Sequence, residues 1–365
     1  MKTAPILRGA LLAAELSLAT TASGQSTEPA VPASPSVPVQ QQPEPQAIPQ
    51  AGTTDAQGIL TEATVVVTGR QPGPGLWRVS KGEHELYILG TLSPLPANME
   101  WETREVEEVI ARSQEVIRPP YITVGSDVSK LRMLTLLPSL IGIRDNPGGK
   151  TLKQVLPADV YTRWQAYKAQ FLPDNRKVEK MRPVLAAAEL YKAAIKRSGM
   201  SMDDAVMPMV SAAIKQHNPK VTVPKVELKI NDVKEIRSTI RQFKASQIED
   251  LQCMSRTLDV IGQDLETMRR RANAWAGGDI DALQALPVSD QYSACMDAIG
   301  ESAIGRKLGL GDMQEQVRRL WLEKAEAALA SNATTFAVLP LSSMLERNGL
   351  LQRLRDKGYE VEAPY

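Results

Sequence analysis

Histidine is scarce in this chain of 365 residues, which has only two, His84 and His217. Imidazole is the commonest nitrogen ligand of catalytic metals, and such a site needs about three protein ligands. His84 lies between Glu83 and Glu85 in a predicted hairpin turn, so we expect its side chain to point to solvent. No histidine or cysteine pair has a ligand spacing. The residues therefore predict no metal site and no cofactor.

A charge of one sign is also missing. The 43 Lys and Arg residues are offset by 42 Asp and Glu residues, and the two kinds are interspersed, so no nucleic-acid partner is indicated. The chain lacks a P-loop, a G-x-S-x-G nucleophile elbow and a dinucleotide fingerprint, because its Gly-x-Gly sequences lie in loops. With 43% hydrophobic residues, the chain is long enough for a full hydrophobic core.

The N-terminus has the order of a secretory signal peptide. Lys2 and Arg8 precede an apolar run over residues 10–21, which is too short to span a bilayer, and a cluster of small residues ends at Gly24. Glu15 interrupts the apolar run, so an amphipathic helix is the alternative to a signal peptide over 1–24. We expect the mature protein to be periplasmic or secreted, with no transmembrane segment.

Residues 25–58 are rich in Pro, Gln, Ser, Thr and Ala and have almost no large apolar side chain. Such a segment buries too little surface to offset chain entropy, so we expect a disordered linker. We expect one folded domain over 59–365, opening with an edge strand at residues 63–68. Cys253 and Cys295 form an even count in an exported chain, which favours a disulfide; the alternative is two buried thiols.

The periodicity predicts an α+β fold. A hairpin over residues 76–89 opens the domain, and a helix (313–330), a strand (334–339), a second helix (346–357) and a strand (359–361) close it. Residues 127–301 read as a helical insertion, whose aromatic stripes after Pro157 and Pro183 are expected to be core. We expect a mixed β-sheet, with the two terminal strand-turn-helix units side by side at its centre.

The two ends of the domain resemble the TraB/GumN family, which is related to the animal TIKI proteases. The similar stretches are Leu76–Pro96, with its Tyr-Ile-Leu-Gly-Thr sequence, then Phe336–Ser343 and the Gly-Tyr-x-Val sequence that begins at Gly358. The resemblance spans about residues 75–364. It implies two G-x-x-H motifs, each following a strand, and metal-dependent peptide hydrolysis.

This chain departs from the family pattern where the chemistry should lie. Ser93 and Ser343 stand at the two motif histidines, Pro340 stands at the second motif's glycine, and Pro119 replaces a functional glutamate. Glu227 matches the one family carboxylate that is kept. The positions that the resemblance assigns to the site are Gly90, Thr91, Ser93, Pro119, Glu227, Pro340 and Ser343.

These substitutions predict an exported pseudoenzyme that binds a peptide or an envelope protein. The first alternative is an active hydrolase that uses Glu227 with Ser93 and Ser343, or with a metal bound by carboxylates. A serine nucleophile needs an adjacent base, and no histidine is placed to serve either serine. The second alternative is a structural component of the envelope.

Overall fold

The computed structural model describes residues 71–364, apart from 126–127, 230–231, 246–247, 264, 287–294, 296–305 and 307–309. The predicted signal peptide (1–24), linker (25–58) and edge strand (63–68) lie outside the described residues and stay predictions. Within the described ranges, no helix has both the length and the apolar character needed to cross a membrane.

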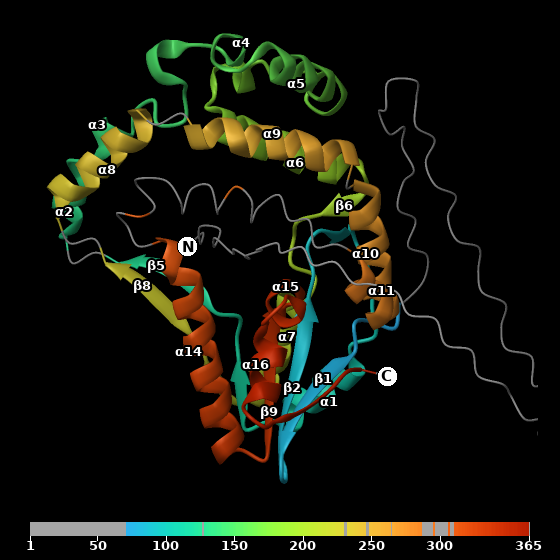
Figure 1. Ribbon diagram of the computed structural model, residues 1–365. Helices are drawn as coiled ribbons and strands as arrows, with labels where there is room; N and C mark the ends of the chain where they lie inside the picture. Colours follow the sequence, from blue (N-terminus) through green and yellow to red (C-terminus); the bar gives the residue numbers. More distant parts are fainter. Residues whose placement is uncertain are drawn as a thin grey trace, which may run out of the picture.

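A mixed six-stranded sheet lies at the centre of the fold, in the order β10-β1-β2-β9-β4-β7 (Figure 1). β1 pairs antiparallel with β2 and β10, whereas β2, β9, β4 and β7 run parallel to one another. The predicted α+β class is confirmed. The strands are β1 (Leu76–Lys81), β2 (His84–Thr91), β4 (Glu115–Ile117), β7 (Lys220–Thr222), β9 (Thr334–Pro340) and β10 (Glu360–Glu362).

The strands of the two terminal units, β2 and β9, are direct neighbours, as predicted. Their register runs from Glu85 opposite Thr334 to Thr91 opposite Pro340. The apolar side chains of β9 are fully buried, as expected for a central parallel strand covered on both faces. Because the two strands are parallel, the residues that follow them leave the sheet at the same edge.

Helices from both ends of the chain pack on this sheet and form the first hydrophobic core. α1 (Arg104–Arg112) buries one apolar face and packs against α7 (Met207–His217). α14 (Leu310–Ser331) contacts β2, β4 and β9 and buries Trp321 completely. The chain then continues through β9 into α15 (Leu341–Leu345) and α16 (Leu350–Asp356).

A second hydrophobic core lies within the helical insertion, in the layer drawn above the sheet in Figure 1. Trp164 and Tyr191 of the two aromatic stripes are buried there, whereas Tyr161 and Tyr167 are half-buried and pack against this core, so the prediction is confirmed in part. α10 joins the two cores, because Met268 belongs to the second and Trp275 to the first. The helices involved are α4 (Leu152–Val155), α5 (Ala158–Phe171), α6 (Pro183–Arg197), α9 (Ile248–Gln263) and α10 (Leu265–Gly277).

Smaller elements complete the described chain. β5 (Tyr121–Gly125) and β8 (Lys225–Lys229) form a separate parallel pair. Three helices lie at the outer margin of the molecule in Figure 1: α2 (Lys130–Leu134), α3 (Leu137–Leu140) and α8 (Val233–Ala245). The rest are β3 (Leu95–Pro96), β6 (Met200–Ser201), α11 (Ile280–Ala285) and the 3-10 helices η1 (Pro147–Gly149) and η2 (Lys177–Lys180).

Two local predictions are wrong. His84 does not point to solvent: it is half-buried, and its Nδ1 lies 2.7 Å from the carbonyl oxygen of Asn332. The reason is the register of β2 on β9, which sets the end of the hairpin against the connection from α14 to β9. The predicted helix over 346–357 begins four residues later, as α16 at Leu350, because a turn in which Asn348 has a φ of 62° separates it from the short helix α15.

The predicted disulfide between Cys253 and Cys295 is confirmed. Both cysteines are buried, and the bond joins α9 to a residue 42 positions further along the chain. The segment that the bond encloses includes α10 and α11.

Candidate functional site

The two serines at the motif positions follow neighbouring parallel strands. Ser93 comes two residues after the end of β2, is exposed, and its Oγ lies 3.9 Å from Met202 Sδ. Ser343 lies in α15, three residues after the end of β9, and is half-buried. Thr91 is buried and donates from Oγ1 to the carbonyl oxygen of Leu339, 3.3 Å away. Both serines therefore leave the sheet at its carboxyl edge.

Gly90 keeps the helix after β9 close to β2. β2 runs through Gly90 and ends one residue later, at Thr91. A Cβ added at Gly90 would lie 2.5 Å from Leu341 Cδ2 and 2.9 Å from Leu341 Cγ. On the backbone, Trp275 Nε1 donates to the carbonyl oxygen of Gly90 at 2.8 Å. The glycine is needed for this close approach and not for an unusual backbone angle.

Replacing Gly90 with alanine is expected to lower the free energy of unfolding by about 2 kcal/mol, because the whole Leu341 side chain must move within a packed core. Urea unfolding followed by tryptophan fluorescence measures this change. Gly277→Ala is the control, since no atom lies within 4 Å of its added Cβ, and its effect should stay within about 0.5 kcal/mol. If adding Leu341→Ala recovers none of the stability lost in Gly90→Ala, the steric explanation is wrong.

Glu227 lies on a different sheet from the two serines. It pairs with Thr123 in the β5–β8 pair, and its side chain covers Gly125, where an added Cβ would meet the carboxylate. Figure 1 shows this pair on the other side of α14 from β2. The fold thus brings the two serine-bearing turns to one edge of the six-stranded sheet, whereas Glu227 belongs to the separate β5–β8 pair; the roles given to the three residues stay predictions.

The segment with Pro119, where the resemblance implies a glutamate, is a bend between two strands. β4 and β7 stop together, and after the bend their chains pair again as β5 and β8. Arg118 lies at the bend, where its amide donates to the Thr222 carbonyl oxygen at 2.9 Å and its Nη2 donates to Ser211 Oγ of α7 at 2.6 Å. Strand pairing therefore resumes after the prolines, although no carboxylate occupies this position.

A cavity of about 300 Å³ opens beside the carboxyl end of β9. Its polar groups are two guanidinium groups, one carboxylate, two primary amides and one hydroxyl, and its remaining walls are apolar. The polar side chains are Arg271, Arg355, Glu346, Gln284, Gln352 and Ser342, and the apolar ones are Trp77, Leu283, Leu341, Met344, Leu345 and Leu351. Ser342, the neighbour of the predicted Ser343, is the serine that lines this cavity.

Ion pairs hold the carboxylate of the cavity in place. Glu346 lies 2.8 Å from Arg318 Nη2 on α14, and burial raises the pKa of Glu346 although Arg318 and Arg353 act in the opposite direction. Arg353 donates to both carboxylate oxygens of Glu315, at 2.7 and 2.9 Å, and these hydrogen bonds lower the pKa of Glu315. α14 and the start of α16 are therefore joined around the cavity.

Sequence reasoning missed Arg271, Ser342 and Glu346. Ser342 is the neighbour of Ser343, the position that the family resemblance predicts. Arg271 is the last of three consecutive arginines on α10, and a run of cations is typical of a solvated helix face, so its burial gave no local signal. Glu346 follows α15 directly and offered no signal either.

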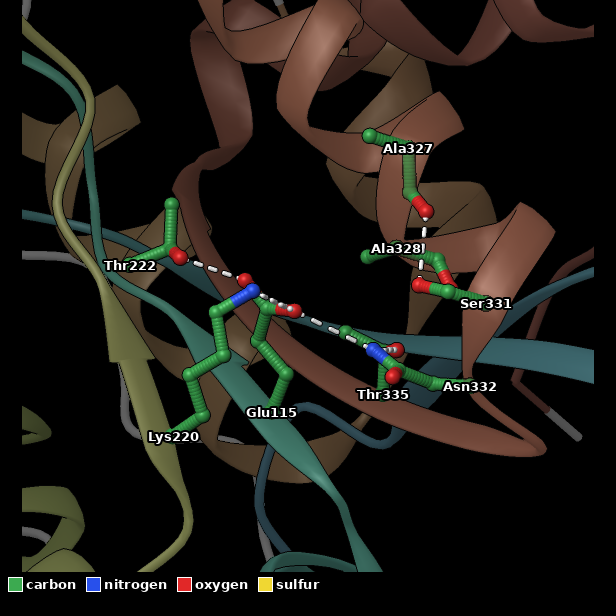
Figure 2. Close-up of polar contacts among 8 residues, drawn as sticks. All are labelled: Glu115, Lys220, Thr222, Ala327, Ala328, Ser331, Asn332 and Thr335. Carbon is green, nitrogen blue, oxygen red and sulfur yellow. Dashed lines mark hydrogen bonds and ion pairs between the residues drawn. The ribbon is translucent and has the colours of Figure 1, made fainter.

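A buried carboxylate lies at the opposite, amino edge of the sheet. Glu115 is 4% exposed at the start of β4, and Figure 2 shows its side chain among polar groups of β7 and the α14–β9 connection. Thr222 Oγ1 donates to Oε1, while Lys220 Nζ and Asn332 Nδ2 donate to Oε2 at 3.0 and 3.1 Å. These groups fix the order β9-β4-β7, so we interpret the cluster as structural.

The hydrogen bonds to Glu115 predict a pH dependence of stability. Burial alone would raise the pKa of Glu115, but donation from Thr222, Lys220 and Asn332 outweighs it and holds that pKa below its usual value. The unfolded chain then binds the proton more tightly than the folded chain, so the stabilisation is present above the ordinary glutamate pKa and is lost as the pH falls through the folded pKa.

Glu115→Gln should therefore cost about 2 kcal/mol at neutral pH, and the difference from the wild type should shrink below about pH 4. Denaturant unfolding at several pH values measures both effects. The exposed Glu105→Gln on α1 is the matched control and should change stability by less than about 0.5 kcal/mol at every pH. A Glu115→Gln penalty that stays constant down to acidic pH contradicts the assignment.

Comparison with known proteins decides the family. The family model described as the TraB/PrgY/gumN family matches residues 75–363, which is most of the chain. The chain belongs to this family. Searches of curated proteins and of solved structures gave no significant match.

The predicted motif positions, Gly90–Ser93 and Pro340–Ser343, lie within the matched residues and at the two strand ends that share the carboxyl edge. In the described part of the chain, no group of three or more His, Cys, Asp and Glu side chains is placed to hold a metal ion. The polar cavity beside β9 lies next to the second motif position, since Leu341 and Ser342 line it.

Proposed function

We propose that this member of the TraB/PrgY/gumN family is an exported protein that acts by binding a peptide. The cavity beside β9 is the main support for this proposal. Its volume of about 300 Å³ is at the lower end of the range for small-ligand sites, and it combines apolar walls with a few polar groups. Such a set suits a short peptide segment better than an apolar ligand.

The polar groups of the cavity suggest how a peptide binds. Guanidinium groups form paired hydrogen bonds to carboxylates, so Arg271 and Arg355 suit a peptide carboxylate. The amides of Gln284 and Gln352 offer both donors and acceptors to a peptide backbone. Glu346 suits an ammonium group or a backbone N–H. The cavity therefore favours a ligand with an acidic end.

Two further features agree with binding without hydrolysis. Serines occupy the positions of both motif histidines, and a serine hydroxyl does not replace imidazole as a ligand of a divalent metal. Glu227, the candidate catalytic carboxylate, belongs to the β5–β8 pair and does not line the cavity. The N-terminal signal-peptide pattern and the disulfide suit an oxidising compartment outside the cytoplasm.

The proposal is tested with a mixture of tetrapeptides that have free carboxyl termini and the same mixture with amidated termini. We expect the free-carboxyl mixture to raise the melting temperature of the full chain more than the amidated one. Mass spectrometry should detect no cleavage, with or without added zinc or manganese. Arg355→Gln should weaken binding about tenfold, the cost of one charged hydrogen bond. Arg347→Gln, exposed and outside the cavity, is the matched control.

Two results would overturn the proposal. Hydrolysis of the peptides with stoichiometric bound metal, lost in Glu227→Gln, would establish the hydrolase alternative. Stable co-purification with an envelope protein, combined with no effect of either peptide mixture on melting, would favour the structural alternative.

A further inference from the structure

An apolar surface lies far from the cavity, on the helices at the outer margin of the molecule. Of the nine most exposed large apolar side chains in the described residues, six fall within residues 131–141 of α2, α3 and the turn after them. Leu131 and Ile141 are each 76% exposed. The others are Met133, Leu134, Leu137 and Leu140. Six such side chains in eleven consecutive residues are unusual on a surface with no partner.

Positive charge surrounds these apolar side chains. Residues 128–144 contain no Asp or Glu. α8, which packs against α3, has four cations and one carboxylate, Glu235, so its net charge is +3. The chain as a whole has a net charge of only +1, so the charge is concentrated here. The four cations of α8 are Lys234, Arg237, Arg241 and Lys244.

Some of these cations hold the helices together, and others remain exposed. Arg237 Nη2 donates to the Thr135 carbonyl oxygen at 3.2 Å, and Lys244 Nζ donates to the Ile141 carbonyl oxygen at 2.6 Å. Both carbonyls lie just past the ends of short helices, where backbone acceptors lack helical partners. Arg132, Lys234 and Arg241 are exposed, and no carboxylate of the described chain lies within ion-pair distance of them.

We propose that α2, α3, residues 141–144 and α8 form a basic apolar surface that docks on an anionic phospholipid bilayer. Interfacial helices combine exposed Leu, Ile and Met with Lys and Arg, so that apolar side chains enter the acyl boundary and cations meet the phosphates. Each cation near an anionic bilayer adds to the attraction, whereas carboxylates, nearly missing here, would oppose it.

A second copy of the chain fits this surface poorly. A symmetric dimer would place the same patch of both copies face to face and bring the cations of α8 close to each other. Like charges near a desolvated interface repel strongly. Charge complementarity therefore favours a lipid surface over self-association.

The test uses the full chain with two kinds of vesicle, pure phosphatidylcholine and a mixture of phosphatidylcholine with phosphatidylglycerol at roughly three to one. Flotation measures the bound fraction. We expect binding to the mixed vesicles, at least tenfold weaker binding to the neutral ones, and weaker binding as salt is raised, because salt screens exposed charges.

Variants separate the apolar and the charged contributions. Leu131→Ser with Ile141→Ser should weaken binding to the mixed vesicles at least tenfold, because two inserted side chains are lost. Arg132→Gln with Arg241→Gln should weaken it about tenfold. The controls alter exposed residues elsewhere: Val221→Ser with Val223→Ser, which are 41% and 40% exposed, and Lys215→Gln with Arg347→Gln. All variants change exposed side chains, and unchanged melting temperatures verify folding.

Three outcomes overturn the proposal. The first is no binding to the mixed vesicles. The second is equal binding by the wild type and the surface variants, which would place the contact elsewhere. The third is concentration-dependent dimerisation without vesicle binding, measured by light scattering. If Leu131→Ser with Ile141→Ser abolishes this dimerisation, a second copy of the chain occupies the surface.

Discussion

Replacing Arg182 with alanine is expected to lower the free energy of unfolding by about 4 kcal/mol, because it removes one half of a buried ion pair. Arg182 is 1% exposed and Asp250 is 6% exposed. Arg182 Nε and Nη2 both lie 2.8 Å from Asp250 Oδ2, and its Nη1 donates to the Phe243 carbonyl oxygen. The guanidinium also lies 4.1 Å from the centroid of the Phe243 ring. The alanine variant leaves the Asp250 carboxylate buried without this cation.

An exposed ion pair in the same helical layer provides the control. Arg163 on α5 lies 2.6 Å from Asp259 on α9, and both side chains are 42% exposed. Solvent screens such a pair, so Arg163→Ala should cost less than about 1 kcal/mol. Urea unfolding of the two variants measures the difference directly. Equal losses in the two variants would mean that burial does not determine the strength of these pairs.

A double variant distinguishes charge burial from packing. Arg182→Met with Asp250→Leu replaces both charges with apolar side chains of similar size, and it should recover most of the stability that Arg182→Ala loses. If the double variant is as unstable as Arg182→Ala, the other hydrogen bonds of Arg182 contribute more than its ion pair.

Arg182 also connects the second hydrophobic core to the basic apolar surface. Its amide donates to the Arg144 carbonyl oxygen at 2.9 Å, at one end of that surface, and its Nη1 contacts Phe243 on α8. Loss of this residue should therefore speed hydrogen exchange over residues 130–145 and 233–245 before it affects the central sheet. If Arg182→Ala also weakens vesicle binding, faster exchange in these two segments would show that the loss follows from local unfolding of the surface.

The sheet could be predicted because its strands have strong local signals. The alternating hairpin over residues 76–89 and the apolar run of β9 are typical of strands, and two similar units at the chain ends suggest neighbouring strands. The break at Arg118–Pro120 was also predictable, since proline cannot continue a sheet ladder. The renewed pairing as β5 and β8 was not, because it depends on two distant segments bending together.

The cavity could not be predicted from the motifs. Its polar side chains come from two stretches that are distant in sequence, residues 271–284 and 342–355, so no spacing rule joins Arg271 with Ser342. His84 shows the same limit: two flanking glutamates suggested an exposed turn, but the register of β2 on β9 sets its ring against Asn332. Tertiary contacts, and not local pattern, determine both outcomes.

The disulfide encloses the helices that complete this cavity. The bond links Cys253 and Cys295, and the enclosed segment supplies Arg271 from α10 and Gln284 from α11. Trp275, on the same segment, holds the backbone of Gly90. Because the crosslink restricts this segment in the unfolded chain, it favours the folded arrangement in which α10 and α11 line the proposed peptide-binding cavity.

Breaking this disulfide is expected to lower the free energy of unfolding by about 4 kcal/mol, the value for a loop of this length when the bond acts on the unfolded chain. Urea unfolding should give the same loss for the reduced wild type and for Cys253→Ala with Cys295→Ala. Alanine is chosen because both positions are buried and a serine hydroxyl there would add its own cost. The double variant should not respond to reductant, whereas the wild type should.

The position of the bond predicts where the loss appears. The reduced protein should exchange amide hydrogens faster in α10 and α11 than in β2 and β9, because the bond encloses these two helices whereas the strands are held by their pairing in the sheet. Peptide binding should also be weaker in the reduced protein, because α10 carries Arg271 of the cavity. A loss below about 1 kcal/mol would show that the folded helices, and not the covalent bond, hold this segment in place.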